Sequence, residues 1–319
     1  MNANVRKISR IAAGSVFSTA ALTAAVSGGI YFYGFYSPRG RQNEDHHILV
    51  KLKTQEQYDH TIELIDGLNA RPYEKVRIRS FDGLILSGRY YHAADGAPLA
   101  ILCHGYRGTP SRDFCGGANI CFDMGMNVLL IEERAHCSSE GHTITFGVKE
   151  RYDVLSWTEY AVERFHSGVK ILLAGISMGA GTVLMASELD LPANVRGILA
   201  DCPFTSPSDI VREVGRSLGL PMKIAYPLTW LAARAFGGFP LTAADASEAV
   251  KAAKVPVLLI HGEADELVPC DMGRKIAEAN PEMIEFHTFP GAGHGLSYVE
   301  DTGRYTALVR SFCRKIFAD

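Results

Sequence analysis

The chain has 319 residues, of which 47% are hydrophobic and 21% are charged, and its formal net charge is −3. This composition excludes extended disorder and fits one large α/β domain with a short additional segment. The sequence contains no long run of lysine or arginine, which argues against nucleic acid as a partner.

The cysteines are odd in number, seven in all, and lie at scattered positions without a CxxC pair. This spacing supports neither a zinc site nor a thioredoxin-like motif, so we expect no metal ion. Free thiols that are buried as small apolar side chains are the simpler interpretation.

The amino-terminal residues 11–36 contain no Asp, Glu, Lys or Arg, and they follow a short basic segment. The stretch is long enough to cross a hydrocarbon core, and it ends in aromatic residues of the kind that gather at a membrane interface. The sequence therefore predicts an N-terminal transmembrane helix, a single-pass anchor within residues 1–40. Two other interpretations stay open: a secretory signal peptide cleaved near residues 25–27, and a terminal helix packed on the domain. Basic residues on both sides leave the membrane orientation undecided.

Residues 41–72 are polar, with a helical pattern around residues 55–68, and predict a connector followed by a helix at the edge of the main domain. Because this connector separates the apolar stretch from the rest, we expect a chain that starts near Arg41 to stay soluble and active. The main domain covers residues 73–319. It opens with a hairpin signal, Asp82-Gly83 between two strand-like runs.

Short apolar runs then alternate with helical lengths along the chain. Runs without polar alternation are typical of strands that are buried on both faces of a parallel sheet. We therefore predict an α/β fold with a mostly parallel central sheet and helices on both faces. The last run alternates more than the others, which indicates a strand nearer the sheet edge. The predicted strands are residues 99–103, 128–131, 169–173, 197–200, 255–260 and 284–289.

One connection, between Asp201 and Val255, is too long for a simple crossover. Its apolar helical stretches predict a helical cap insertion at about residues 205–253, placed above the sheet.

The sharpest signal in the chain is a G-x-S-x-G motif made of Gly175, Ser177 and Gly179 with their neighbours. It follows a predicted strand and precedes a helix-like stretch, which is the strand–turn–helix context that a nucleophile elbow requires. The glycines let the helix pack close to the strand, and the serine projects at the amino end of the helix. Ser177 is therefore the predicted nucleophile.

A serine hydroxyl needs a general base, and a base needs an acid that orients it. His294 lies in a glycine-rich loop just after the last predicted strand, whereas His104 and His261 each end a strand and are better explained as structural. Asp265 follows the preceding strand, so the chain order is serine, acid, histidine, as in this type of triad. Asp201, which also ends a strand, is the alternative acid.

The oxyanion hole needs two backbone donors. One is expected to be the N–H of Met178, the residue after the nucleophile. The loop over residues 104–108 follows an early strand, and we assign the second donor to the N–H of Tyr106.

Four segments together resemble the α/β-hydrolase superfamily, and in particular bacterial serine hydrolases of general type: residues 104–108, 133–141, 175–180 and 261–294. The resemblance covers about residues 73–317 and implies the α/β-hydrolase fold. Such relatives usually have Gly at the position of Cys137, and Asp at that of Glu132 or Glu133. The loop that contains these residues departs from the pattern, whereas the triad positions do not.

The resemblance implies a carboxylesterase-like serine hydrolase that cleaves ester bonds of small or medium substrates through an acyl-enzyme, with the cap supplying an apolar pocket. One alternative is a serine peptidase or acyl-peptide hydrolase of the prolyl-oligopeptidase-like group. That group normally carries a large propeller domain before the catalytic domain, for which the roughly 70 residues before Tyr73 are too few. Another is a non-catalytic scaffold, against which the complete Ser–Asp–His set argues. No cofactor is expected, because all the reacting groups belong to the protein.

Overall fold

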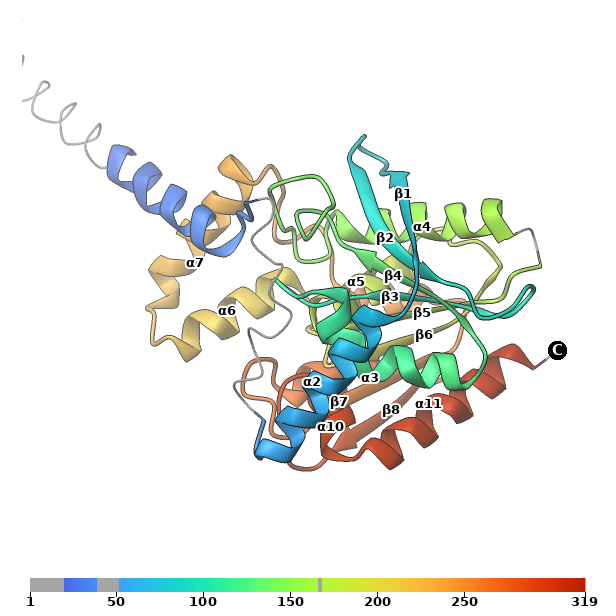
Figure 1. The fold of residues 1–319 in the computed structure, drawn as a ribbon. Helices are drawn as coiled ribbons and strands as arrows, with labels where there is room; N and C mark the ends of the chain where they lie inside the picture. Colours follow the sequence, from blue (N-terminus) through green and yellow to red (C-terminus); the bar gives the residue numbers. More distant parts are fainter. Residues whose placement is uncertain (1–19, 39–51, 166–167, 319) are drawn as a thin grey trace, which may run out of the picture.

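In the computed structural model, which describes residues 20–38, 52–165 and 168–318, eight strands form one sheet with helices on both faces (Figure 1). The strand order is β1-β2-β4-β3-β5-β6-β7-β8, where the pairs β1–β2 and β2–β4 are antiparallel and the others are parallel. This is the mostly parallel sheet, entered through a hairpin, that the sequence predicts. The strands are β1 (Glu74–Arg79), β2 (Ile85–Tyr91), β3 (Leu99–Cys103), β4 (Asn127–Glu132), β5 (Ile171–Ile176), β6 (Val195–Asp201), β7 (Val257–Gly262) and β8 (Ile284–Phe289).

The central parallel strands are buried on both faces. In β3, Leu99, Ile101 and Cys103 join one core cluster, whereas Ala100 and Leu102 join the other. Successive residues therefore serve opposite faces, and both faces are apolar, which explains the continuous hydrophobic runs. The last strand, β8, lies at the sheet edge and is only partly buried, as its alternating sequence predicts.

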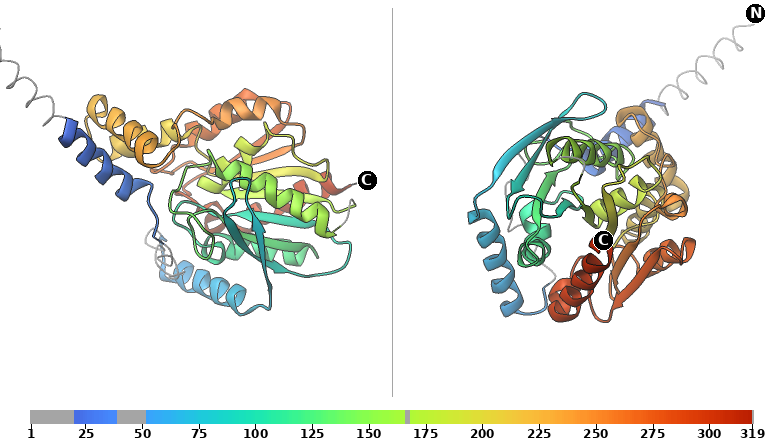
Figure 2. Two further views of the ribbon diagram at one scale, coloured as in Figure 1. Left: turned by 90° about the horizontal axis from the view of Figure 1, so that it is seen from above. Right: turned by 90° about the vertical axis from the view of Figure 1, so that its right-hand side faces the viewer.

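Helices cover the two faces of the sheet (Figure 2). Those on one face, α4, α5, α8 and α9, contribute to one core cluster, and α2, α3 and α11 contribute to the other. The helices are α2 (Gln55–Ala70), α3 (Pro110–Asp123), α4 (Glu150–Phe165), α5 (Met178–Ala186), α6 (Pro207–Ser217), α7 (Met222–Leu231), α8 (Ala246–Ala249), α9 (Cys270–Ala279), α10 (Ser297–Glu300) and α11 (Thr302–Phe317). A π-helical turn (Ala232–Phe236) continues α7, and a 3-10 turn (Val250–Ala252) continues α8.

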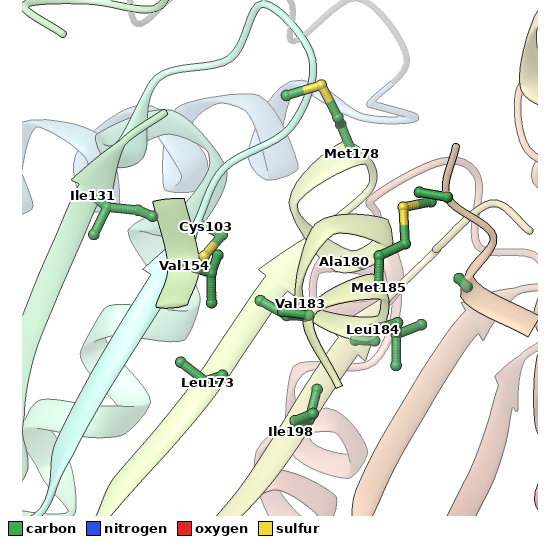
Figure 3. Close-up of a cluster of buried hydrophobic side chains, with 14 of the residues drawn as sticks. Cys103, Ile131, Val154, Leu173, Met178, Ala180, Val183, Leu184, Met185 and Ile198 are labelled. Atoms are coloured by element: carbon green, nitrogen blue, oxygen red, sulfur yellow. The ribbon is translucent and has the colours of Figure 1, made fainter. Parts of the chain in front are cut away.

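The helix that follows the serine motif, α5, is buried along its whole length. Its Val183 and Leu184 share a core cluster with Leu173 of β5 and Ile198 of β6 (Figure 3). Packing on all sides fixes α5 over the sheet and thereby fixes the position of its amino end, where Ser177 lies.

A helix over residues 20–34 lies beside α7 (Figures 1 and 2). Within the described ranges no helix combines the length and the apolar character needed to span a bilayer, and residues 1–19 of the predicted anchor lie outside those ranges.

Two rings at the aromatic end of the amino-terminal stretch pack against the protein, whereas Phe32 and Tyr33 stay exposed. Tyr31 and Phe35 are 8% and 2% exposed and belong to the core of the main domain. The Phe35 ring packs against Phe146 and Phe239, with ring centroids 5.8 Å and 5.5 Å away. The expected separation of this stretch from the main domain is therefore wrong, because Tyr31 and Phe35 pack within the core of that domain.

Residues 205–253 form helices, as the sequence predicts, but they extend toward the helix over residues 20–34 (Figure 1). The ring of Phe236, in the turn after α7, stacks on Tyr31 with ring centroids 6.0 Å apart. None of the residues of α7 itself is buried.

Candidate active site

Ser177 lies on the turn between β5 and α5. Its φ of 55° and ψ of −114° are strained for a residue that carries a Cβ. The two glycines of the motif are required by close approach: a Cβ on Gly179 would lie 1.9 Å from the Cys103 carbonyl oxygen, and one on Gly175 would lie 2.2 Å from that of Gly179. The turn therefore presents the Ser177 hydroxyl at the amino end of α5.

Ser177, His294 and Asp265 form one hydrogen-bonded chain. His294 Nε2 is 2.8 Å from Ser177 Oγ, and His294 Nδ1 is 2.7 Å from Asp265 Oδ2. A carboxylate at Nδ1 holds the tautomer in which that nitrogen carries the proton, which leaves Nε2 free to accept the hydroxyl proton. All three residues follow the carboxyl ends of parallel strands, so the sheet brings together positions that are far apart in sequence.

The Asp265 carboxylate is surrounded by donors. Oδ1 accepts the backbone N–H of Leu267 at 3.0 Å and of Val268 at 2.8 Å, and His261 Nε2 lies 3.5 Å from Oδ2. Burial by itself raises the pKa of this carboxyl, but the His261 and His294 imidazoles and the Val268 N–H outweigh burial and hold the pKa well below its ordinary value. Asp265 is therefore ionised at neutral pH and can stabilise an imidazolium at His294.

Asp201, the alternative acid, has a different environment. Its Oδ1 lies 3.5 Å from Ser297 Oγ, and among the described residues it forms no hydrogen bond with His294. Burial raises the pKa of Asp201 to about 6, although a hydrogen bond from Tyr305 opposes this shift. The Asp201 carbonyl accepts the Ser177 N–H at 2.8 Å, so this residue supports the turn under the serine.

The loop over residues 104–108, called the oxyanion loop below, lies against Ser177. A Cβ on Gly105 would be 3.4 Å from Ser177 Cβ, and the Gly105 N–H donates to Asp113 Oδ2 at 2.8 Å. The N–H groups of Tyr106 and Met178, the two predicted donors, have no hydrogen-bond acceptor in the ranges that the structure describes. Donors of this kind beside a nucleophile are what a developing oxyanion requires.

The loop that departs from the family pattern supports the oxyanion loop. His136 Nε2 accepts the Arg107 N–H at 3.0 Å, and its Nδ1 donates to the Arg134 carbonyl at 2.8 Å. Burial lowers the pKa of His136 well below its ordinary value, so the ring is neutral and can play both roles. Cys137 has a φ of 47°, the left-handed region that favours glycine. Burial raises the pKa of the Glu133 carboxyl well above its ordinary value, so it keeps its proton.

A cavity of about 370 Å³ opens beside Ser177 and His294. Its walls are mostly apolar, and they come from α2, α3, α10 and the loops around them. They include Leu52, Thr61, Phe114, Leu267, Leu296, Tyr298 and Val299.

The expected contribution of the cap to this pocket is wrong, since no described lining residue falls within residues 205–253. The edge helix α2 and the helix α3 serve as walls instead. Sequence reasoning missed them because a helical pattern reports which side faces the core and carries no signal for the one or two residues that face a cavity.

The sulfur of Cys202 lies close to the triad. The described residues contain no disulfide, and the Cys202 thiol lies with atoms of Asp265 and His294 in a group whose potential ligand atoms are within 4.8 Å of one another. The Asp265–His294 hydrogen bond already uses two of these atoms, and burial raises the pKa of the Cys202 thiol well above its ordinary value. A protonated thiol is a poor metal ligand, so this set of side chains suits proton transfer better than metal binding.

Comparisons with known proteins agree with this fold. The uncharacterized protein YqkD of Bacillus subtilis (strain 168) is 24% identical over 225 residues, which cover 70% of this chain and 73% of that protein. The Pyrococcus furiosus esterase Pf2001 has a TM-score of 0.65 at 21% identity, covering 78% of this chain and 93% of that one. Est1E from Butyrivibrio proteoclasticus, solved with ferulic acid bound, has a TM-score of 0.58 at 20% identity, covering 76% of this chain and 100% of that one. These likenesses show the α/β-hydrolase fold.

A model of the prolyl oligopeptidase family matches residues 143–319, which is more than half of the chain. The matched range contains Ser177, Asp265 and His294 and begins after the oxyanion loop. The chain therefore belongs to the prolyl oligopeptidase family, within the α/β-hydrolase superfamily.

Proposed function

We propose that this protein is a serine hydrolase that cleaves ester bonds of small or medium substrates through an acyl-enzyme on Ser177. The observation that supports this proposal best is the hydrogen-bonded chain from Ser177 Oγ through His294 to Asp265, with distances of 2.8 Å and 2.7 Å. It lies at the mouth of an apolar cavity of a size that fits a small acyl group.

In the proposed reaction, Ser177 Oγ attacks the ester carbonyl carbon while His294 Nε2 takes the hydroxyl proton. The carbonyl oxygen becomes an oxyanion, which the N–H groups of Tyr106 and Met178 stabilise. When the tetrahedral intermediate collapses, the bond to the alcohol oxygen breaks and His294 gives that oxygen the proton. A water molecule then attacks the acyl-enzyme with His294 again as base, which releases the acid and restores Ser177.

Two candidate bonds compete, an ester and a peptide. The family match and the shared catalytic fold support a peptidase. The cavity favours an ester, because its walls are mostly apolar and its Arg112 and Asp113 side chains pair with each other at 2.7 Å, leaving few polar groups for a peptide backbone. The names of two structural neighbours, Pf2001 of Pyrococcus furiosus and a protein of Thermogutta terrifontis, call them esterases, which also supports an ester substrate.

The test compares p-nitrophenyl esters of increasing acyl length with peptide p-nitroanilides, using the full-length protein. We expect hydrolysis of short and medium esters and much slower cleavage of the anilides. The reverse preference would make the protein a peptidase. Failure to turn over either class and to react with a fluorophosphonate would favour a non-catalytic scaffold.

We also propose that the amino-terminal stretch attaches the protein to a membrane. The helix over residues 20–34 exposes apolar side chains at Leu22, Val26, Phe32 and Tyr33, which supports attachment to a lipid surface. Fractionation of cells should recover the full-length protein with membranes. A mature amino terminus near Gly28 would instead indicate a cleaved signal peptide, and a wholly soluble protein that keeps Met1 would indicate a helix packed on the domain.

A further inference from the structure

Two side chains of the main domain hold the oxyanion loop by accepting hydrogen bonds from its backbone N–H groups. Asp113 at the start of α3 accepts the Gly105 N–H at 2.8 Å, and the neutral His136 ring accepts the Arg107 N–H at 3.0 Å. The N–H of Tyr106 lies between these two fixed points. Neither contact involves the side chain of Tyr106 or Arg107, and both side chains are engaged elsewhere.

Those two side chains reach the carboxyl end of the helix over residues 20–34. The Tyr106 hydroxyl donates to the Gly34 carbonyl oxygen at 2.9 Å. The Arg107 guanidinium donates through one nitrogen to the carbonyl oxygens of Tyr33, at 2.6 Å, and Tyr36, at 3.2 Å. Three hydrogen bonds therefore join this helix end to the oxyanion loop.

The polarity of a helix end explains why Tyr106 and Arg107 bind there. The last carbonyl groups of a helix have no partner within it and carry a partial negative charge, which a cation and a hydroxyl donor can satisfy. Arg107 itself has a φ of 50°, a strained conformation for a residue with a side chain, and such strain persists only where surrounding contacts hold it.

The helix end is in turn fixed to the main domain. The Tyr31 hydroxyl lies 2.8 Å from Thr143 Oγ1, and the Ile144 N–H donates to the Phe35 carbonyl at 2.8 Å. The Phe146 ring lies between the two parts, with its centroid 5.8 Å from that of Phe35 and 5.0 Å from that of Tyr106. The loop and the helix end therefore share one packed cluster.

We propose that residues 31–36 are a positioning element for the oxyanion hole: by accepting hydrogen bonds from Tyr106 and Arg107, they hold the Tyr106 N–H where the substrate oxyanion forms. This inference rests on the proposed function. It makes the amino-terminal helix part of the working enzyme, in contrast to the sequence-based expectation that a chain starting near Arg41 stays active.

The test uses the full-length protein and two substitutions that leave every backbone group in place. Arg107→Met removes the guanidinium and keeps the length of the side chain, and Tyr106→Phe removes only the hydroxyl. Arg107→Lys keeps a cation that can still donate and should restore most of the activity. Arg164→Met is the matched control, because Arg164 also contacts an aromatic ring and an acceptor, Glu74, but at the far edge of the sheet.

We expect Arg107→Met to lower kcat for an ester substrate by roughly ten-fold, which is part of the loss seen when an oxyanion donor is removed outright, while KM changes little. Binding of a trifluoromethyl ketone, which forms a tetrahedral oxyanion on the serine, should weaken by about the same factor. Tyr106→Phe should act in the same direction with a smaller effect. Phe35→Leu should weaken the packing of the helix end against Phe146 and Phe239. If the helix end acts on the loop through Arg107, the fold-losses of kcat in Phe35→Leu and Arg107→Met should not multiply in the double variant.

The outcomes separate this inference from the proposed function. If the original protein shows no Ser177-dependent hydrolysis, the proposed function itself fails. If it hydrolyses esters and both loop variants keep the same kcat per fluorophosphonate-reactive site and the same ketone affinity, the positioning role is wrong and the function stands. A lower melting temperature with unchanged kcat, or an equal loss of kcat in Arg164→Met, would also overturn the inference.

Discussion

Asp265 and Asp201 show how two aspartates at neighbouring strand ends acquire different properties from their surroundings. Asp265 accepts hydrogen bonds from backbone and imidazole donors, which hold its pKa well below the ordinary range. Asp201 is as deeply buried but has fewer donors, so its pKa rises to about 6. The order of residues along the chain favoured Asp265 as the acid, whereas nothing in the sequence reports the raised pKa of Asp201.

The first prediction concerns the acid that orients His294. Asp265→Asn should lower kcat for ester hydrolysis by about 10³–10⁴-fold, because the amide no longer holds the tautomer with the proton on Nδ1. Asp201→Asn should cost much less, since Asp201 forms no hydrogen bond with His294 in the described part of the chain. Steady-state kinetics of the two purified variants checks this, and a collapse of kcat in Asp201→Asn alone would assign the role to Asp201.

The second prediction concerns the pH dependence of stability. Between about pH 4 and pH 6 the unfolded Asp201 ionises while the buried folded carboxyl keeps its proton, so the free energy of unfolding falls as pH rises through this window. Asp201→Asn removes this contribution, and its stability relative to the original protein should improve by up to about 3 kcal/mol from pH 4 to pH 7. Urea unfolding at both pH values measures the difference.

The control for this experiment is Asp190→Asn, since Asp190 is exposed and forms an ion pair with Lys254 at 3.2 Å. The change in relative stability between the two pH values should be larger for the buried Asp201→Asn than for this exposed control. A relative stability of Asp201→Asn that does not change with pH would show that the buried carboxyl does not titrate in this window.

At the scale of elements, the turn from β5 to α5 depends on backbone contact rather than on side chains. The third prediction is that Gly179→Ala lowers the free energy of unfolding by about 3 kcal/mol or more, because its Cβ would meet the Cys103 carbonyl oxygen at 1.9 Å. Gly67→Ala in α2 is the matched control. A Cβ there meets nothing within 4 Å, so stability should rise by roughly 0.5–1 kcal/mol. Equal changes in the free energy of unfolding for the two variants, measured with denaturant, would contradict the close approach of Gly179 to the Cys103 carbonyl.

The fourth prediction concerns the walls of the pocket. Val299→Phe adds bulk to the cavity beside Ser177 and should lower kcat/KM for p-nitrophenyl octanoate relative to the acetate by roughly ten-fold. Trp230→Ala in α7 should leave this ratio unchanged, because Trp230 does not line the cavity in the described part of the chain. A change of acyl-chain-length preference in Trp230→Ala alone would indicate that the cap lines the pocket.

The elements that the sequence predicts well are those with a local signature. Buried parallel strands form continuous apolar runs, and predicted strands such as residues 99–103 and 284–289 coincide with β3 and β8. The nucleophile elbow is also predictable, because close backbone approach requires the glycines of its motif. The pocket walls have no such signature, because Val299 or Phe114 can be assigned to a cavity only once the helices are placed in space.

At the scale of the whole molecule, the packing partners of the amino-terminal aromatic residues could not be predicted from the sequence. An apolar helix that ends in aromatic rings has the same composition whether those rings meet lipid or protein. Phe35 contacts Phe146 and Phe239, which are more than a hundred residues away in the chain, and no local pattern encodes that choice. The contact between this helix end and the oxyanion loop is likewise a property of the folded molecule alone.

Every step of the proposed reaction requires Ser177 as the group that becomes acylated. Mass spectrometry of the protein after reaction with a fluorophosphonate, or after a burst with a p-nitrophenyl ester, measures this directly. We predict one adduct per molecule on the peptide that contains Ser177, and neither an adduct nor ester hydrolysis above background in folded Ser177→Ala. An adduct on another residue, or near-full hydrolysis in Ser177→Ala, would contradict the account.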